Sequence, residues 1–390
     1  MNVVIFGEQF MFPEGNAATN RVHNYAKGYM ENGINVHVLC FLNVFSDHNE
    51  GYFEGIHFFN VYNQKSRNKS FIMRRLINAK KYYTTFQAFR RINKSDRIIA
   101  IHLYANLFST IFFAWIIAKL FHIRIIKECN EHPIIYYQGN IAKRRKSFLE
   151  FYVETKMVDG ILCISKHLIS LYKSYGFKDY RLLLVPSTVD PNRFTRKTRI
   201  PLQFKYIGYF GSLSFSRDNL DLLLKAYSEI HLKFPDIHLV IGGFGGKGDI
   251  DKIIDYAQSQ ELTNHIHLLG YLSRNEIVNY ISNAEILVMV RHKDLQSEAS
   301  FPSKLTEYLA TGNPVLTVKV GDIDNYLTDN VNAFLVEPGD HRELVLKIEL
   351  ILENKQHALA VGRKGKELTD SVFNYSVQVK RVVDFIEKLN

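Results

Sequence analysis

Cysteine is scarce in this sequence, with only Cys40, Cys129 and Cys163 among 390 residues. The three are scattered, and each stands in an apolar, strand-like context, so neither a zinc-binding spacing nor a disulfide framework is present. This usage fits a reducing compartment best, and we expect a cytoplasmic protein. A basic segment and a cleavage site are missing at the start, so residues 1–7 are predicted to form a first strand.

Other familiar patterns are also missing. The longest apolar stretch, 98–121, is interrupted by His102, Asn106 and Lys119, which favours a buried strand followed by a helix over a membrane span. No GxGxxG dinucleotide motif follows the first strand. The glycine-rich segment 242–248 is one residue too short for a phosphate-binding P-loop, and no Ser or Thr follows its lysine. We expect no metal and no tightly bound cofactor.

The length of 390 residues allows two domains with full cores, and 46% hydrophobic residues indicate a globular protein.

Charge is distributed unevenly between the two halves. Residues 1–195 hold 26 Lys+Arg and 14 Asp+Glu, a balance of +12, so the rest (49−26=23 against 39−14=25) has a balance of −2. The basic half suggests an acidic partner, either a membrane surface or a polyanion. Nucleic acid is disfavoured because no recognised binding motif accompanies the charge.

Short apolar segments alternate with helical patterns in the N-terminal half, which indicates a parallel sheet. The predicted strands are Asn2–Gly7, Val36–Phe41, Ile98–Leu103, Arg124–Glu128 and Gly160–Ser165. Between them, 70–94 is basic, with apolar residues recurring at helical spacing. This pattern is compatible with a helix lying on anionic lipid, and also with a solvated helix packed on its own domain. A second basic cluster, 143–146, precedes further aromatic residues.

The segment 300–320 carries the strongest chemical pattern. Pro302 suits a first helical turn, Ser300 can cap it, and Gly312 ends the helix before a buried strand. A helix N-terminus beside Lys304 attracts an anion such as a diphosphate. Glu307 lies about 4.5 Å further along the axis, where a carboxylate could accept from ribose hydroxyls. The alternative is an ordinary surface ion pair between Lys304 and Glu307.

This segment, Ser-Phe-Pro-Ser-Lys-Leu-Thr-Glu-Tyr-Leu-Ala-Thr-Gly-Asn-Pro-Val, resembles the donor-binding helix of the retaining family 4 glycosyltransferases. The resemblance implies an α/β protein of GT-B fold, with two Rossmann-like domains facing a central cleft. It implies an acceptor-side domain over 1–195, a nucleotide-sugar-binding domain over 196–372 and a helix, 373–390, that crosses back to the first domain. A polar, basic linker is expected near 195–204.

The same resemblance assigns site residues. The donor would contact Gly15, Asn16, Ser212, Gly270, Tyr271, Ser300, Phe301, Pro302, Ser303 and Glu307. Lys304, Arg217, Glu131 and His132 would act in catalysis, and Arg21 would face the donor and acceptor. Two positions depart from the family pattern. Ala299 stands where many members carry a first Glu, with Glu298 one residue away, and Ser212 replaces one of two cations on the diphosphate.

The expected activity is therefore transfer of a sugar from a nucleotide-diphosphate sugar, with retention of configuration and without a metal, to a glycan or lipid-linked acceptor. The acceptor is expected to belong to surface polysaccharide biosynthesis on the inner face of the membrane. Two alternatives remain: a nucleotide-sugar 2-epimerase of the same fold, and a catalytically silent assembly partner suggested by Ala299 and Ser212.

Overall fold

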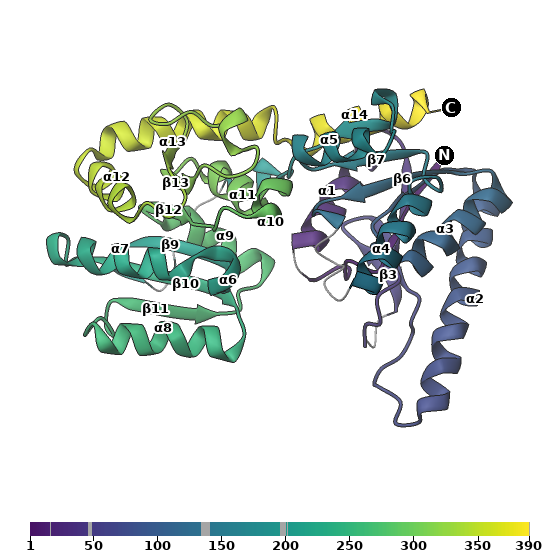
Figure 1. Cartoon of the computed structure of the whole chain (residues 1–390), viewed down its shortest axis with the longest axis horizontal. Coiled ribbons are helices and arrows are strands. Elements are labelled where there is room, and N and C mark those ends of the chain that lie inside the picture. Colours follow the sequence, from purple (N-terminus) through teal and green to yellow (C-terminus); the bar gives the residue numbers. More distant parts are fainter. Residues whose placement is uncertain (16, 46–48, 134–140, 196–199, 201, 390) are drawn as a thin grey trace. The chain divides into compact units, whose positions relative to one another are not determined.

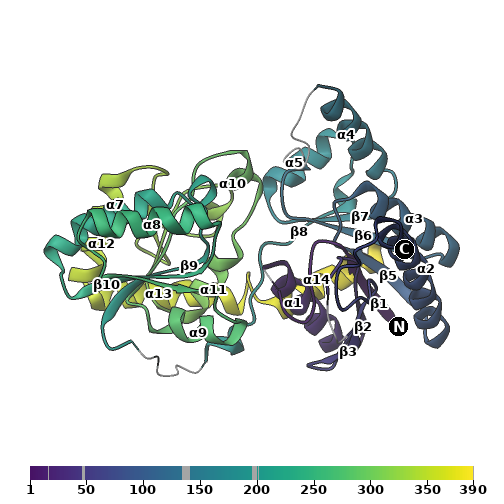
Figure 2. The same ribbon diagram turned by 90° about the horizontal axis from the view of Figure 1, so that it is seen from below.

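The computed structural model describes residues 1–15, 17–45, 49–133, 141–195, 200 and 202–389. The chain divides into two compact units (Figures 1 and 2). Unit 1 comprises Met1–Thr188 together with Tyr375–Asn390, and unit 2 comprises Val189–Asn374. Each unit has its own sheet and its own hydrophobic core, as expected of a domain of this size.

Unit 1 is built on a sheet with the strand order β3-β4-β2-β1-β5-β6-β7-β8. The strands are β1 (Asn2–Gly7), β2 (Asn35–Cys40), β3 (Glu50–Phe53), β4 (Ile56–Asn60), β5 (Ile98–Leu103), β6 (Arg124–Cys129), β7 (Gly160–Cys163) and β8 (Leu182–Leu184). All neighbours are parallel except β3 and β4. The five strands predicted from sequence are confirmed to within two residues at each end, because continuous apolar segments are what a strand covered on both faces requires.

The helices of unit 1 cover this sheet. They are α1 (Ala17–Glu31), α2 (Phe71–Ser95), α3 (Phe108–Phe121), α4 (Ile141–Glu154), α5 (Lys166–Ser174) and the C-terminal α14 (Tyr375–Lys388). The last helix packs beside α1 in both views (Figures 1 and 2). Gly28 allows the close approach, since a Cβ there would lie 2.6 Å from Val379. Val379 and Val382 of α14 thereby complete the core of unit 1.

The chain passes between the units at Thr188–Val189 and again at Asn374–Tyr375. The sequence prediction placed these boundaries at 195/196 and 372/373. The residues up to Thr188 stay with unit 1 because α1 binds them: Asn24 donates to the Thr188 carbonyl over 2.9 Å. Val189 then pairs with the segment around Asn374 inside unit 2. Within the expected linker, 196–199 and 201 lie outside the described residues.

Unit 2 holds a fully parallel sheet with the order β11-β10-β9-β12-β13-β14. Its strands are β9 (Lys205–Ser212), β10 (Ile237–Phe244), β11 (Ile266–Gly270), β12 (Ile286–Met289), β13 (Val315–Val318) and β14 (Phe334–Val336). Its longer helices are α7 (Leu220–Lys233), α8 (Lys247–Ser259), α9 (Arg274–Asn283), α11 (Ser303–Thr311), α12 (His341–Glu353) and α13 (Lys355–Asp370). In Figure 2, α7 and α8 lie on one side of the sheet and α9, α11 and α13 on the other. This is the doubly wound Rossmann arrangement.

The longest apolar stretch of the sequence folds as predicted. Residues 98–121 form the buried strand β5 and then α3, whose buried face includes Ile111, Ala114 and Ile117. Throughout the part of the chain that the structure describes, no helix has both the length and the apolar character needed to cross a bilayer.

Four histidines gather in unit 2, at the amino ends of β10 and β11. His238 and His267 approach within 2.8 Å, Nδ1 to Nε2, and Phe204 stacks on both rings at 4.0 and 4.6 Å between centroids. His265 lies 5.0 Å from His238, and His231 of α7 lies 4.2 Å from His265. Burial is the main cause that lowers the pKa of His238 and His267, and the neighbouring imidazoles lower it further. Asp236 acts in the opposite direction on the pKa of His238.

We expect acid to destabilise unit 2 through these rings. Their pKa values lie below the unfolded value of about 6.5, so the stability is present above that pH and is lost as the pH falls through the folded values. Replacing His238→Phe with His267→Phe keeps the stacking on Phe204 and removes the titration. Denaturant unfolding at pH 7 and pH 5 should show a smaller acid loss in this variant than in the natural protein. Replacing the distant His122→Phe should leave the acid loss unchanged, and equal losses in all three proteins would contradict the assignment.

Candidate active site

The switch point of the unit 2 sheet lies between β9 and β12. From β9 the chain winds outward to β10 and β11, and it then returns to β12 on the other side of β9. Ligands of such sheets bind at the carboxyl ends of the strands on either side of this point. Here Gly211 and Ser212 are the last residues of β9, and Arg291 lies two residues beyond β12.

The predicted helix begins beside these strand ends and is confirmed as α11 (Ser303–Thr311), which ends at Gly312 with φ +76°. Its start differs in detail from the prediction. Pro302 is the residue before the first turn, and Ser300 ends the preceding short helix α10 (Leu295–Ala299). Instead of capping α11, the Ser300 hydroxyl accepts from Arg291 Nη1 over 3.1 Å. Ser303 occupies the first helical position, where backbone amides have no helical partner.

Lys304 extends from the first turn of α11 to the end of β9. Its Nζ donates to the Tyr209 hydroxyl over 2.7 Å and to Asp218 Oδ1 over 3.1 Å. Only about a sixth of the side chain is exposed, and burial lowers the pKa of Lys304 although Asp218 opposes this. An ammonium has three donors, and these two contacts leave one for a ligand.

Two arginines add positive charge around the same carboxylate. Arg291 is 7% exposed, and burial lowers its pKa while the nearby Asp218 raises it. Arg217, exposed in the short helix α6 (Phe215–Asp218), packs against the side-chain amide of Gln296 and lowers the pKa of both Arg291 and Lys304. These three cations therefore outnumber the nearby carboxylates, Asp218 and Asp294. A bound anion would offset this excess charge, and a diphosphate has the required charge and size.

Glu307 lies one turn further along α11 and has its own partner. Arg193 Nη1 lies 3.3 Å from Glu307 Oε1, and its Nη2 donates to the Arg274 carbonyl over 2.8 Å. The alternative of a simple Lys304–Glu307 surface pair is wrong, since the two side chains pair with Asp218 and Arg193. Both Arg193 and Glu307 keep about a sixth of their side chains exposed.

The other donor residues of unit 2 lie at different depths. Ser212 is exposed at the end of β9, and Gly270 ends β11 with φ +69° followed by Tyr271, which is 65% exposed. Phe301 is different, because its side chain is buried against the rings of Tyr326 and Phe373. The predicted donor contact at Phe301 can therefore involve only its backbone.

Unit 1 holds the remaining predicted residues. Glu131 and His132 follow the carboxyl end of β6, and the His132 ring lies 5.6 Å from that of His167. Burial and the His167 imidazole lower the pKa of His132. Gly15 lies just before α1, where a Cβ would be 2.3 Å from Thr19 Oγ1. Asn16 lies outside the described residues.

Arg21 was predicted to face the donor and acceptor, but its side chain is instead bound inside unit 1. It is 6% exposed, and its Nε donates to Glu128 Oε1 over 2.7 Å while its Nη atoms donate to the carbonyls of Val185 and Pro186. The other Glu128 oxygen contacts His102 Nε2 at 3.1 Å. Burial raises the pKa of Glu128, but Arg21 and His102 together outweigh it and the net direction is downward. The cluster is structural: it fixes the last residues of unit 1 to its sheet.

Sequence reasoning missed four residues of the unit 2 site: Tyr209, Asp218, Arg291 and Arg193. A usable signal existed for Arg291, which lies two residues beyond a buried strand at the switch point. Asp218 stands next to the predicted Arg217, but nothing in its spacing indicates Lys304. Tyr209 is buried within β9 and carries no polar pattern.

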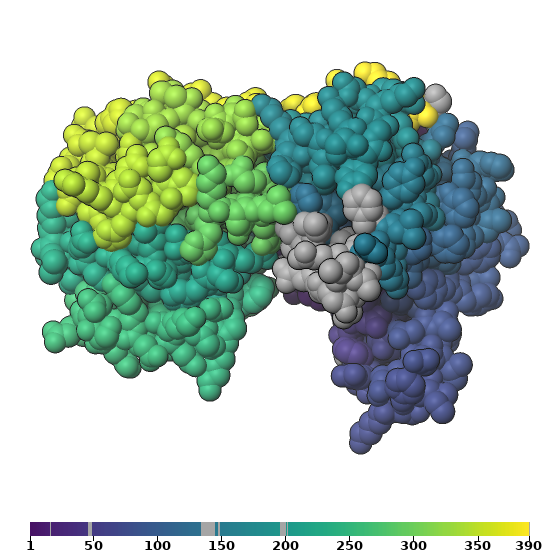
Figure 3. Space-filling view, in the orientation of Figure 1, coloured from purple at the N-terminus to yellow at the C-terminus, as the bar shows by residue number. Residues whose placement is uncertain are grey.

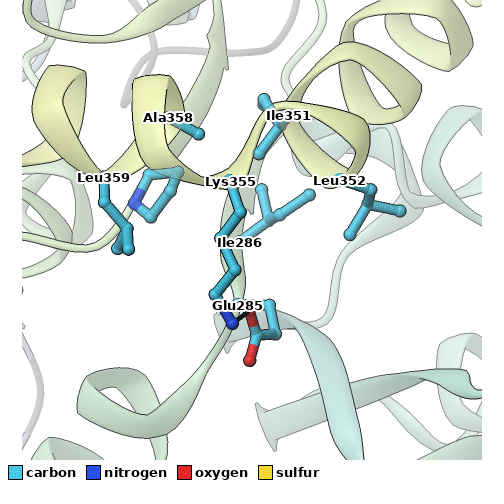
Figure 4. A pocket seen from close by; sticks show the side chains of 8 residues that line it. Glu285, Ile286, Ile351, Leu352, Lys355, Ala358 and Leu359 are labelled. Carbon is cyan, nitrogen blue, oxygen red and sulfur yellow. Dashed lines mark ion pairs between the residues drawn. The ribbon is translucent and has the colours of Figure 1, made fainter.

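A small pocket elsewhere in unit 2 is a poor candidate. It lies between the amino ends of β12 and β13 and the helices α12 and α13, with Lys355 paired to Glu285 at 2.7 Å (Figure 4). Its lining contains none of the predicted site residues, and it is at the strand ends opposite to the switch point. Among the described residues, no group of three or more His, Cys, Asp or Glu side chains could hold a metal ion.

Comparison with known proteins finds similarity to glycosyltransferases. Residues 191–368 match the family model of glycosyl transferases group 1. An uncharacterised glycosyltransferase of Methanocaldococcus jannaschii is 25% identical over 183 residues, which are 47% of this chain and 48% of that protein. The chain thus spans about half the length of the curated relatives it matches.

Two solved structures resemble the whole chain. Sucrose-phosphate synthase from Thermosynechococcus elongatus superimposes with a TM-score of 0.75 at 15% identity, covering 100% of this chain and 98% of that one. Anabaena HepE in complex with UDP-glucose gives 0.72 at 16% identity, covering 99% of each chain. The predicted fold class, GT-B with two Rossmann-like domains, is confirmed.

Proposed function

We propose that this protein is a retaining glycosyltransferase of family 4, which transfers a hexose from a nucleotide-diphosphate sugar without a metal. The observation that carries the proposal is the cluster of Lys304, Arg291 and Arg217 around Asp218, at the switch point where a nucleotide is expected. The match of 191–368 to glycosyl transferases group 1 and the resemblance to a UDP-glucose complex support it.

In this proposal the cations stabilise the charge that develops on the leaving diphosphate. Lys304 and Arg291 are held by Tyr209, Asp218 and Ser300 before any ligand binds, so little reorganisation is needed during the reaction. Such preorganised donors are usually the largest catalytic contribution, about 3 kcal/mol for one strong donor. Ser303 and the first α11 amides bind phosphate oxygens, and Glu307 accepts from the ribose.

The acceptor is a glycan or a lipid-linked saccharide of surface polysaccharide biosynthesis, bound by unit 1. Glu131 and His132, at the carboxyl end of β6, would contact the transferred sugar or the acceptor hydroxyl. The basic balance of residues 1–195 supports an anionic environment for that acceptor, at the inner face of a membrane.

Nucleotide binding tests this function directly. We expect UDP, GDP or ADP to raise the melting temperature, because a ligand at about 100 times its Kd adds about 2.7 kcal/mol of stability. With a panel of nucleotide sugars and no acceptor, the preferred donor should be hydrolysed slowly to the free sugar and nucleotide.

Two other results would replace this proposal. Conversion of the donor to its 2-epimer, without release of nucleotide, would identify an epimerase. The absence of a thermal shift with all three nucleotides would favour a silent assembly partner.

A further inference from the structure

The long helix α2 of unit 1 has fully buried residues only in its second half, although Lys81 and Tyr82 on its inner face contact Phe41. Its 25 residues begin at Phe71, yet its buried residues are Thr85, Ala88, Phe89 and Ile92. From Phe71 to Thr84 no residue is buried. In Figures 1 and 3 this amino-terminal half extends beyond the sheet and the other helices of unit 1. The first half of α2 therefore has a stripe of side chains with no partner in its own unit.

The exposed stripe is apolar. Ile72, Leu76 and Tyr83 are 71, 58 and 64% exposed, and Ala79 between them is exposed as well. These positions are spaced by four, three and four residues, so they lie on one face of the helix. The face is about 17 Å long at about 1.5 Å per residue. Phe71 and Met73, at 59 and 45% exposure, widen its start. A solvated helix has no reason to align its large apolar residues outward, so this face is suited to a partner.

Positive charge borders the same face. Arg75 lies three residues after Ile72, and Lys80 lies four residues after Leu76, so both flank the stripe. Arg90 and Lys94 continue the line of the stripe toward the end of α2. None of these four cations is paired with a carboxylate in the described part of the chain, whereas Arg91 is bound to Glu50. The surrounding sequence is equally one-sided: residues 55–95 contain ten Lys+Arg and no Asp or Glu.

We propose that the amino-terminal half of α2 docks this protein on an anionic lipid surface. The apolar stripe enters the boundary between headgroups and acyl chains, and the flanking cations contact lipid phosphates, as in amphipathic helices that lie in the plane of a membrane. The ten cations favour anionic lipid over a protein partner, because a complementary protein surface would need a similar number of carboxylates. The sequence pattern of α2 is also compatible with a helix packed on its own domain. The inner face of this half does contact unit 1 through Lys81 and Tyr82, but the exposure of Ile72 and Leu76 shows that the apolar stripe itself is not packed on the domain.

Vesicle flotation with the full chain tests the proposal. The protein should float with vesicles of phosphatidylcholine containing about a third phosphatidylglycerol, and remain unbound with phosphatidylcholine alone. The double variant Arg75→Gln with Lys80→Gln should bind about 30-fold more weakly, since each basic residue near such a surface contributes about 1 kcal/mol, or about fivefold. Ile72→Gln with Leu76→Gln should lose most of the remaining, salt-resistant binding.

Matched variants in unit 2 control for nonspecific effects. Arg363→Gln with Lys364→Gln removes the same charge from the exposed face of α13, and Leu232→Gln with Leu346→Gln removes exposed leucines from α7 and α12. Both controls should float like the natural protein. A tryptophan in place of Ile72 should show a blue-shifted emission with the anionic vesicles, and one in place of Leu232 should not.

Four outcomes would overturn the proposal: no flotation with anionic vesicles, equal loss in the unit 2 controls, equal binding to neutral vesicles, or a dimer that disappears in Ile72→Gln with Leu76→Gln. The last would identify α2 as an interface between copies. Flotation is measured without any nucleotide or acceptor, so its result does not depend on whether the transferase function is correct.

Discussion

Replacing Lys304→Met should lower the rate of sugar transfer by about 100- to 1000-fold, the range for loss of one preorganised charge-stabilising donor. The same change should destabilise unit 2 by about 3 kcal/mol, because the buried Asp218 would lose its paired ammonium and keep only the nearby Arg291. Methionine keeps the length and the apolar stem of lysine, so packing against Gly211 and Tyr209 is preserved. Steady-state kinetics and denaturant unfolding measure the two effects separately.

The double variant Lys304→Met with Asp218→Asn separates catalysis from stability. Removing both charges should restore stability to within about 1 kcal/mol of the natural protein, since a buried pair often contributes little net stability. Activity should stay low, because the donor to the diphosphate is still absent. Lys319→Met, which breaks an exposed pair with Glu337, should change neither quantity measurably. If the double variant regained activity along with stability, Lys304 would have only a structural role.

The helix that presents Lys304 could be predicted because its signals are local. Pro302, the four-residue spacing of Leu305 and Leu309, and Gly312 are enough to define where α11 runs and which face is buried. The parallel strands were predictable for the same reason, since each is a short apolar segment with a turn after it. The predicted relation between Lys304 and Glu307 was also correct in placing both away from the buried leucines.

The partners of these residues could not be predicted, because they come from distant parts of the chain. Asp218 is 86 residues from Lys304, and Arg193 is 114 residues from Glu307. Arg21 was misassigned for the same reason: its partner Glu128 is 107 residues away, and a helical arginine with a buried long-range carboxylate has no distinct local pattern. Spacing identifies the face that a residue occupies but not the side chain that meets it.

The α2 helix shows a related limit. The stripe through Ile72, Leu76 and Tyr83 was recognised from its period, yet the period does not say whether an apolar face meets a core or a partner. The core contacts of α2 come instead from Ala88, Phe89 and Ile92, one and a half turns further along. Only the structure shows that the half of α2 with the clearer apolar period is the exposed half.

Replacing Gly243→Ala should be among the most disruptive single substitutions in unit 2. Gly243 faces Gly211 in the β10–β9 register, and a Cβ there would lie 1.7 Å from the Gly211 carbonyl oxygen. Its φ of +142° is in addition strained for any side chain. The end of β9 must move, and with it the contact of Gly211 with Lys304. We expect a loss of roughly 3–4 kcal/mol in stability.

Gly248→Ala is the matched control, five residues further along the same segment. Gly248 lies in the first turn of α8, and a Cβ there would meet nothing within 4 Å. Alanine is the better helix former by up to about 1 kcal/mol, so this variant should be as stable as the natural protein or slightly more stable. Denaturant unfolding and nucleotide-induced thermal shifts should separate the two: Gly243→Ala loses both stability and nucleotide binding, and Gly248→Ala keeps both. Retained nucleotide binding in a folded Gly243→Ala variant would show that the end of β9 is not part of the site.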